Sequence, residues 1–219
     1  MMLTTDPTPP EATVLYFVRH GETEYNRKGI VQGSGIDSVL NETGRSQAQR
    51  LGRRFAAESI DVVYSSTLVR AKQTADIVTK HLESVERCQL DDLREMSWGV
   101  LEGEPPSDTR DSSLEEIKTF WSNGKYGHAV DGGESILDVR ERAVRAAQHI
   151  VEVEGGRNIL AVTHGRFLRV LLASICEDYD LSHMSTLGHS NTCVNRVVYR
   201  DGVFRADLLN CTSHLATAA

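Results

Sequence analysis

The stretch TVLYFVRHGETEYN, residues 13–26, decides how the rest of the chain is interpreted. Residues 14–18 form an unbroken apolar run, which is typical of a strand buried on both faces of a parallel sheet. Arg19 and His20 follow at its carboxyl end. Ligands of open α/β sheets bind at that edge, and a guanidinium beside an imidazole there can hold a phosphate and attack it. An isolated Arg-His pair would also fit a strand that simply ends in polar residues.

Two further apolar runs end in residues of the same kind. Residues 158–163 form a run that ends in His164 and Gly165. Residues 62–64 form a third, short run, followed by SSTLVRAKQTA with Arg70 inside it. Because the carboxyl ends of parallel strands meet at one edge of a sheet, the sequence predicts a pocket that combines two imidazoles with two guanidiniums.

Six ordered motifs resemble those of the histidine phosphatase superfamily, the phosphoglycerate mutase-like group. They are VRHGETEYN, QG at 32–33, SSTLVRAKQTA around Arg70, LREMSWGVLEG around Glu95, GGES at 132–135 and VTHG around His164. They run from residue 18 to residue 165 in the order and spacing of that family, and the resemblance covers residues 14 to about 200. A single RHG triplet would be weak support, whereas the ordered set is specific.

The resemblance implies a phosphomonoesterase that works without a metal or cofactor. We expect His20 to attack phosphorus and form a phosphohistidine, which water then hydrolyses. Arg19 and Arg70 would clamp the phosphoryl oxygens, and His164 would donate a hydrogen bond to the same group. The attacking imidazole must be neutral. Nearby guanidiniums disfavour its protonation, and a hydrogen bond from its other nitrogen to a backbone carbonyl would fix the tautomer.

The resemblance also selects the general acid and base. LRE followed by WGVLEG places Glu95 in the family's acid position, where it would protonate the leaving oxygen and then accept a proton from water. The residues alone leave Glu22, Glu24 and Glu102 as competitors. Candidate substrate contacts are Asn26, Gln32, Gly33, Gly165 and Asn191. The other six of the eight histidines lack such a context, and we expect them at the surface or in packing roles.

Strands alternating with helical patterns predict an α/β fold. We expect a three-layer α/β/α sandwich with a mainly parallel central sheet, in which the last strand pair can be antiparallel at an edge. The apolar spacing predicts helices over 44–57, from 68 to 82, from 134 to near Gly155 and after 165. Asn41 or Thr43 is the expected cap of the first helix, Ser65, Ser66 or Thr67 that of the second, and Gly155 the glycine that ends the third. Two strands, 193–199 and 203–209, flank the turn Asp201-Gly202.

The predicted domain organisation is simple. Residues 1–12, with three prolines, are expected to be a flexible leader, residues 13–210 a single domain and residues 211–219 a C-terminal tail. Residues 27–43, rich in Gly, Asn and Ser, predict a long functional loop over the strand end that carries His20. Residues 99–131, broken by glycine and proline, predict a lid or specificity insert.

Composition narrows the class of partner. A formal net charge of -7 argues against non-specific binding to nucleic acid or anionic membranes. The four cysteines show neither disulfide nor zinc spacing, no run approaches ~18 apolar residues, and the N-terminus lacks a signal-peptide pattern. We therefore expect a cytoplasmic protein whose partner is a small phosphate ester, and the sequence leaves its oligomeric state open.

Three alternatives remain at this stage. A cofactor-dependent phosphoglycerate mutase would need extra cations for the substrate carboxylate, where residues 102–113 (EGEPPSDTRDSS) offer Arg110 alone. A metallohydrolase could use His20, His164 and Glu95 as a facial triad, but two arginines aimed at the same spot would repel the metal ion. The third alternative is a non-catalytic phosphate-binding or partner-binding module.

Overall fold

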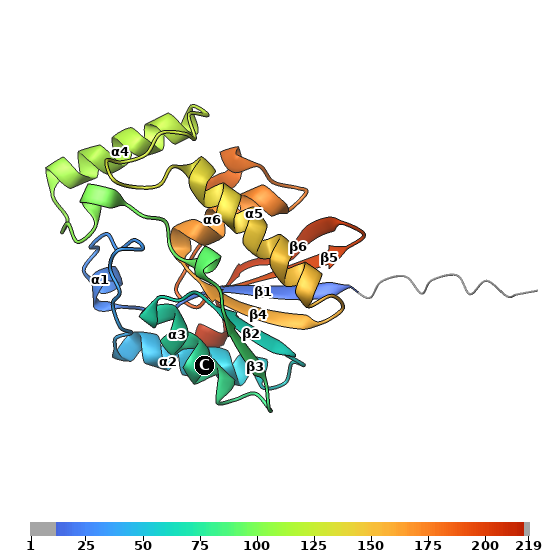
Figure 1. Ribbon diagram of the computed structural model, residues 1–219. Coiled ribbons are helices and arrows are strands. Elements are labelled where there is room, and N and C mark those ends of the chain that lie inside the picture. Colours follow the sequence, from blue (N-terminus) through green and yellow to red (C-terminus); the bar gives the residue numbers. More distant parts are fainter. Residues whose placement is uncertain (1–11, 217–219) are drawn as a thin grey trace, which may run out of the picture.

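A six-stranded sheet in the order β3-β2-β4-β1-β5-β6 runs through the computed structural model, which describes residues 12–216 (Figure 1). The strands are β1 (Thr13–Arg19), β2 (Val62–Ser65), β3 (Glu86–Gln89), β4 (Asn158–Thr163), β5 (Val194–Arg200) and β6 (Val203–Cys211). The first four are mutually parallel, and β5 and β6 are antiparallel at one edge. The predicted mainly parallel α/β sheet is confirmed.

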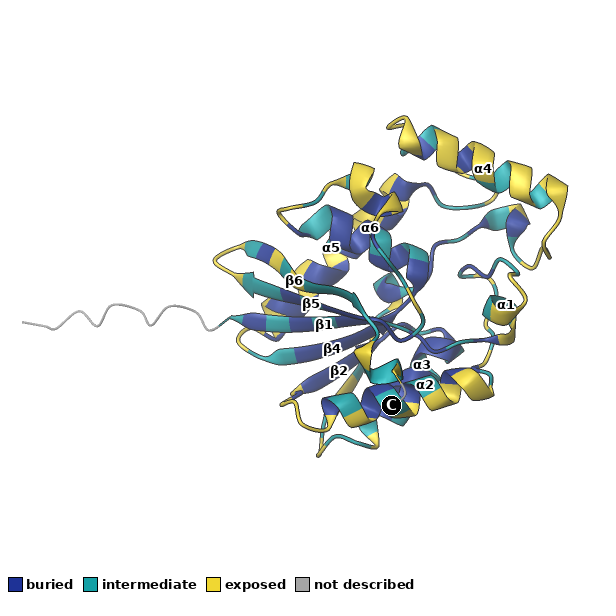
Figure 2. Cartoon of the chain, turned by 180° about the vertical axis from the view of Figure 1, so that it is seen from behind, coloured by how far each residue is buried: buried dark blue, intermediate teal, exposed yellow. Residues whose placement is uncertain are grey.

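Helices cover both faces of this sheet. Helices α2 (Glu42–Phe55) and α3 (Val69–Thr79) lie on one face, and α5 (Ile136–Val153) and α6 (Gly165–Ile175) on the other (Figure 1). Alternate side chains of β1 explain the two layers, because Leu15 and Phe17 pack with α5 and α6, whereas Val18 packs with α2 and α3. The inner strands β1, β2 and β4 are therefore largely buried (Figure 2), whereas the edge strands β3 and β6 are mostly exposed or half-buried.

The remaining elements are short or lie at the periphery. They are α1 (Glu24–Arg27), α4 (Asp108–Ser122), η1 (Asp91–Leu93), η2 (Gly99–Leu101), η3 (Leu181–Ser185) and η4 (Ser213–Leu215). Helix α4 is the core of the predicted insert and lies beyond α6, with most of its surface exposed (Figure 2). Its buried side chains, Ile117 and Trp121, hold it to the body of the protein.

Capping agrees with the sequence in one helix and differs in two. Asn41 caps α2, since its Oδ1 accepts from the Gly44 N–H at 2.8 Å. For α3 the expected Ser or Thr cap is wrong: the cap position is Leu68, which makes no side-chain cap bond. At the end of α5 the left-handed glycine is Gly156, with φ 78°, one residue after the predicted Gly155.

The C-terminal hairpin forms at the predicted turn. Asp201 and Gly202 both have positive φ, 53° and 82°, as a two-residue hairpin turn requires. Strand β6 then runs to Cys211, beyond the predicted 203–209, and η4 is tied to α2 by a hydrogen bond from Arg50 Nη1 to the Leu215 carbonyl oxygen (2.9 Å). The predicted leader up to residue 11 and the end of the predicted tail, 217–219, lie outside the described residues.

No helix within residues 12–216 combines the length and the apolarity that a bilayer crossing requires.

Close backbone packing after β1 generates a stability prediction. A Cβ added to Gly44, in the first turn of α2, would lie 2.1 Å from the Glu22 carbonyl oxygen and 2.6 Å from the Glu22 nitrogen. We expect Gly44→Ala to lower the free energy of unfolding by about 1–3 kcal/mol, because this overlap outweighs alanine's better helix propensity. Urea unfolding measures the change.

Gly127→Ala is the matched control for this variant. A Cβ there meets only Leu137 Cδ1 at 3.8 Å, so its effect should stay within about 0.5 kcal/mol. Wild-type stability in Gly44→Ala would contradict the packing described here.

Candidate active site

Strand register brings the two histidines of the HG motifs together. In the parallel pair β1 and β4, Arg19 is the register partner of Thr163, so His20 and His164 leave the sheet side by side. The His20 N–H donates to the Thr163 carbonyl oxygen at 2.9 Å, and the two imidazole centroids are 5.2 Å apart. The neighbouring strand β2 delivers Ser66 to the same edge, where its N–H donates to the Val162 carbonyl oxygen.

His20 is buried and its tautomer is fixed by the backbone. Its side chain is 2% exposed, and Nδ1 lies 2.7 Å from the Gly21 carbonyl oxygen. Because a carbonyl only accepts, Nδ1 carries the proton and Nε2 keeps its lone pair. Burial, followed by the charges of Arg70 and Arg19, holds the pKa of His20 well below its usual value. The resting ring is therefore neutral, as a nucleophile requires.

Arg19 is held by the loop that precedes β5. Its Nη1 donates to the His189 carbonyl oxygen at 2.5 Å, while Nε is buried without a partner. Burial lowers the pKa of Arg19, and the negative charge of Glu95 partly offsets that effect. Gly165 gives this guanidinium room, since a Cβ there would lie 3.1 Å from Arg19 Nε and 2.6 Å from His189 Cδ2.

Arg70 lies in the first turn of α3 and is fully buried. Its Nη1 and Nη2 donate to the carbonyl oxygens of Ile36 (2.7 Å) and Gly33 (3.0 Å), so the long loop after α1 holds its outer edge. Its Nε has no partner. Burial lowers the pKa of Arg70 to about 10, against the opposing effect of Glu95. The predicted functional loop thus supports a guanidinium of the site.

His164 has one ring nitrogen engaged and one free. Nε2 lies 2.8 Å from Ser66 Oγ, which also accepts from the Leu68 N–H at 3.3 Å. Because the Ser66 hydroxyl oxygen already accepts the Leu68 N–H, its own hydrogen can be donated to Nε2 of His164. Nε2 then acts as the acceptor, and the proton of the ring lies on Nδ1. Nδ1 is buried without a partner. Burial and the Arg70 charge lower the pKa of His164 well below its usual value.

Glu95 sits at the N-terminus of α6. Its Oε1 accepts from the N–H groups of Met96 and Phe167, both at 2.9 Å, and Oε2 accepts from the Arg166 N–H at 3.1 Å. Glu95 is 7% exposed, and its charge acts on both Arg19 and Arg70. Its carboxylate therefore belongs to the same cluster as the basic side chains.

The competing carboxylates have other partners. Glu24 is paired with Arg27 on the surface, and Glu22 Oε1 accepts from Asn41 Nδ2 at 2.8 Å. Glu102 braces the loops, because it accepts from the N–H groups of Gly35 and Trp98, both at 2.9 Å. Of these four carboxylates, Glu95 is the one whose charge acts on both Arg19 and Arg70.

The candidate substrate contacts fall into two groups. Asn191 Nδ2 donates to the His20 carbonyl oxygen (3.1 Å) and lies 3.4 Å from Asn26 Oδ1, so both amides are at the rim of the site. Gln32 is tied to Thr23 and Ser38. The Gly33 carbonyl holds Arg70, and Gly165 lies against Arg19, as described above. Gln32, Gly33 and Gly165 therefore support the wall of the pocket.

Several side chains of this region were not singled out from the sequence. From the sequence Ser66 is a candidate helix cap, whereas in the structure its hydroxyl contacts His164. His189, placed among surface or packing histidines, supplies the carbonyl that holds Arg19, and burial together with Arg169 and Arg19 lowers its pKa to about 3. Arg166 and Arg169 also lie beside the site. The sequence signal for these two arginines is their three-residue spacing directly after the second HG motif, which places them on one face of a helix beside His164.

Unsatisfied donors converge at this site. Within residues 12–216, five buried side-chain nitrogens lack a hydrogen-bond partner, and three of them are Arg19 Nε, Arg70 Nε and His164 Nδ1. Buried polar groups are normally paired, and an unpaired group calls for a specific explanation. Across the same residues, no cluster of three or more His, Cys, Asp or Glu side chains could hold a metal ion.

Residues 15–212 match the histidine phosphatase superfamily (branch 1). The chain belongs to this superfamily. The match covers nearly the whole described fold, from the first strand to the end of the last one. The predicted family is confirmed, and with it the class of enzyme, a phosphatase of the histidine phosphatase superfamily.

Relatives and solved structures agree with this assignment. A metal-independent phosphoserine phosphatase of Arabidopsis thaliana is 33% identical over 208 residues, which is 94% of this chain and 85% of that protein. Phosphoglycerate mutase-like protein 4 of the same plant is 38% identical over 155 residues, 70% of this chain and 67% of that protein. The structure of Bacillus stearothermophilus YhfR superposes with a TM-score of 0.83 at 34% identity, covering 93% of this chain and 100% of that one.

Proposed function

We propose that this protein is a metal-independent phosphomonoesterase that hydrolyses small phosphorylated metabolites through a phosphohistidine on His20. The supporting observation is the convergence of buried, unpartnered nitrogens of Arg19, Arg70 and His164 around a neutral imidazole. A phosphoryl group presents several negatively charged oxygens, which these nitrogens would bind. The proposal gives each of these atoms a partner.

In the first step, Nε2 of His20 attacks phosphorus while the P–O bond to the leaving group breaks. Arg19 and Arg70 bind the non-bridging oxygens, and His164 Nδ1 donates to the same group. The electron pair of the broken bond stays on the leaving oxygen, which takes a proton from Glu95, so Glu95 must enter this step in its protonated form. The products are a free alcohol and a phosphohistidine.

In the second step, water attacks phosphorus and Glu95 accepts its proton. The P–N bond breaks, and its electron pair returns to His20 Nε2. Inorganic phosphate leaves, and the site regains its neutral imidazole. The Nδ1 hydrogen bond to Gly21 persists throughout and supports the positive charge that the ring carries as a phosphohistidine.

Phosphoglycerate mutase chemistry is less well supported. In the insert, Arg110 is already engaged, since it pairs with Asp111 and its Nη1 donates to the Gly29 carbonyl oxygen at 2.6 Å. Lys118 is paired with Glu115 at 2.6 Å. Of the three cations in residues 99–131, Arg110 and Lys118 are thus paired with carboxylates, and Lys125 lies over the Phe120 ring, 5.4 Å from its centroid. A non-catalytic phosphate-binding module would not need the carboxylate of Glu95 beside Arg19 and Arg70.

A metal-dependent mechanism fits the same residues poorly. His20 Nδ1 and His164 Nε2 have backbone or hydroxyl partners, and both oxygens of Glu95 accept backbone N–H groups. Two guanidiniums nearby would also repel a divalent cation. Full activity in excess EDTA is the expected behaviour.

The substrate, the insert and the location complete the proposal. A small phosphate ester fits the site, and the relative named as a phosphoserine phosphatase supports this substrate class. We propose that residues 99–131 set specificity. The four free cysteines, Cys88, Cys176, Cys193 and Cys211, suit the reducing cytoplasm, and the acidic chain is not expected to act on nucleic acid or membranes.

A phosphoenzyme on His20 is the first test of this function. Rapid quench with 32P-labelled p-nitrophenyl phosphate should give a label that is acid-labile and base-stable, because the phosphorus is bound to nitrogen. His20→Ala should abolish the label. His149→Asn, on the exposed face of α5, is the control and should retain it. Turnover without any label, or equal label in His20→Ala, would exclude the covalent mechanism.

The role of Glu95 depends on the leaving group. Glu95→Gln should slow hydrolysis of alkyl phosphates by about 10²–10⁴-fold, because a poor leaving group needs a proton. Loss with p-nitrophenyl phosphate, whose leaving group is already stable, should be much smaller. Steady-state kinetics on both esters measures the ratio, and Glu24→Gln on the surface is the control. Equal losses on the two esters would remove Glu95 from this role.

A further inference from the structure

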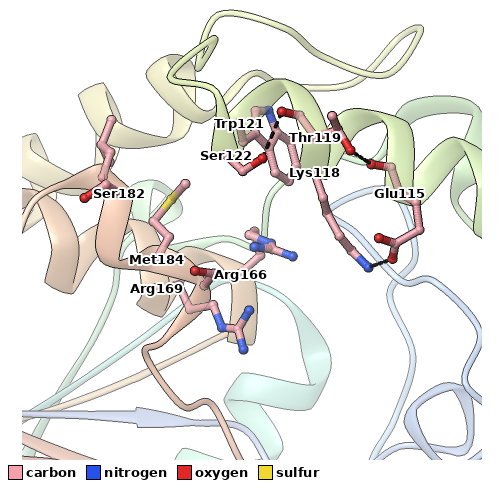
Figure 3. Close-up of a pocket in the computed structure, with 11 residues that line it drawn as sticks. Glu115, Lys118, Thr119, Trp121, Ser122, Arg166, Arg169, Ser182 and Met184 are labelled. Carbon is pink, nitrogen blue, oxygen red and sulfur yellow. Dashed lines mark hydrogen bonds and ion pairs between the residues drawn. The ribbon is translucent and has the colours of Figure 1, made fainter.

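A cavity of about 430 Å³ opens between α4, α6 and η3, next to the site described above (Figure 3). Arg166 and Arg169, three residues apart on α6, extend from one wall of it. The opposite wall comes from the insert and from η3. Its main lining side chains are Lys118, Trp121, Leu181 and Met184.

The two arginines are unusual in having no counter-charge. Across residues 12–216, neither guanidinium makes an ion pair or a side-chain hydrogen bond, and Arg169 Nε is buried without a partner. Lys118, on the same cavity, is neutralised by Glu115. Burial, and then the like charge of Arg169, lowers the pKa of Arg166 to about 10. Two adjacent, partly desolvated cations are costly to a fold unless an anion joins them.

Arg166 is also held in one orientation. Its guanidinium carbon lies 5.4 Å from the ring centroid of Trp98 and 5.3 Å from that of Trp121. These indoles, themselves 5.8 Å apart, cover the guanidinium and leave its N–H edges for a ligand. Trp121 belongs to α4, so the insert positions an α6 side chain.

The cavity lies on the leaving-group side of the site. The Arg166 N–H holds Oε2 of Glu95, the proposed proton donor to the leaving oxygen. Arg169 lies close enough to Arg19 for the two charges to interact, and it contributes to the lowered pKa of His189. The rest of a substrate that places its ester oxygen at Glu95 would therefore extend toward Arg166 and Arg169.

We propose that this cavity binds the leaving group of the substrate, and that Arg166 and Arg169 recognise a second anionic group on it, a carboxylate or a second phosphate. The assignment rests on the proposed function, because Glu95 defines the leaving-group side. Both anions offer paired oxygens to the guanidinium edges. The preferred substrates are thus doubly anionic metabolites, and neutral or cationic leaving groups leave the arginines unpaired.

The test compares esters that differ in the second anion. O-phosphoserine is paired with O-phosphoethanolamine, which lacks the carboxylate, and fructose 1,6-bisphosphate is paired with fructose 6-phosphate. p-Nitrophenyl phosphate is the reference without a second anion. The enzymes are wild type, Arg166→Gln, Arg166→Lys and the control Arg140→Gln, an exposed arginine on α5. Changing the Arg166 side chain leaves its backbone N–H to Glu95 in place.

The expected result is selective. Wild type should prefer the doubly anionic member of a pair, and Arg166→Gln should lower kcat/KM for that member roughly 10- to 100-fold, mainly through KM. Hydrolysis of p-nitrophenyl phosphate should fall by a clearly smaller factor than hydrolysis of the doubly anionic ester, and Arg166→Lys should recover part of the loss. Preference within the serine pair identifies a carboxylate, and preference within the fructose pair identifies a phosphate.

Two results would overturn the subsite. One is a wild type that hydrolyses p-nitrophenyl phosphate in a His20-dependent manner but shows no preference in either pair. The other is an Arg166→Gln variant that loses equal activity on all esters. A wild type that hydrolyses no phosphomonoester would instead refute the proposed function itself, and the subsite with it.

Discussion

The parallel pairing of β1 with β4 is the constraint on which the site depends. Its register sets Arg19 opposite Thr163, so the next residues, His20 and His164, must leave the sheet together. Both strands are buried from two sides, which makes a slip of this register costly. The close pair of imidazoles therefore follows from backbone pairing in the core, before any side chain of the pocket is considered.

The buried charges require support that the loops supply. Arg19 donates to the His189 carbonyl, and Arg70 donates to those of Gly33 and Ile36, so the outer edge of each guanidinium is satisfied. The Nε atoms stay unpaired. Backbone carbonyls can hold a guanidinium without neutralising it, whereas a carboxylate in the same place would. The unpaired Nε atoms of Arg19 and Arg70 lower the stability of the fold, but they keep a positive electrostatic potential at His20.

Much of this arrangement could be predicted from the sequence, because strand ends and motif order determine the positions of His20, His164, Arg19 and Arg70. Other features depend on tertiary contacts that no local pattern encodes. Ser66 reads as a helix cap, yet it meets His164 only because β2 lies beside β4. The cavity beside α6 likewise exists only because the insert folds back and its Trp121, together with Trp98, covers the Arg166 guanidinium. Apolar periodicity predicts the helix after Gly165, but it does not predict which segment packs against that helix.

The central claim is that burial and two guanidiniums keep His20 neutral, with its proton on Nδ1 and its lone pair on Nε2. The most direct test is 15N NMR of histidine-labelled protein, with His20 assigned by the His20→Gln variant, followed from pH 8 to pH 5. The account predicts shifts of the neutral Nδ1–H tautomer throughout this range. Protonation of His20 near pH 6.5, or a proton on Nε2 in the resting enzyme, would contradict it.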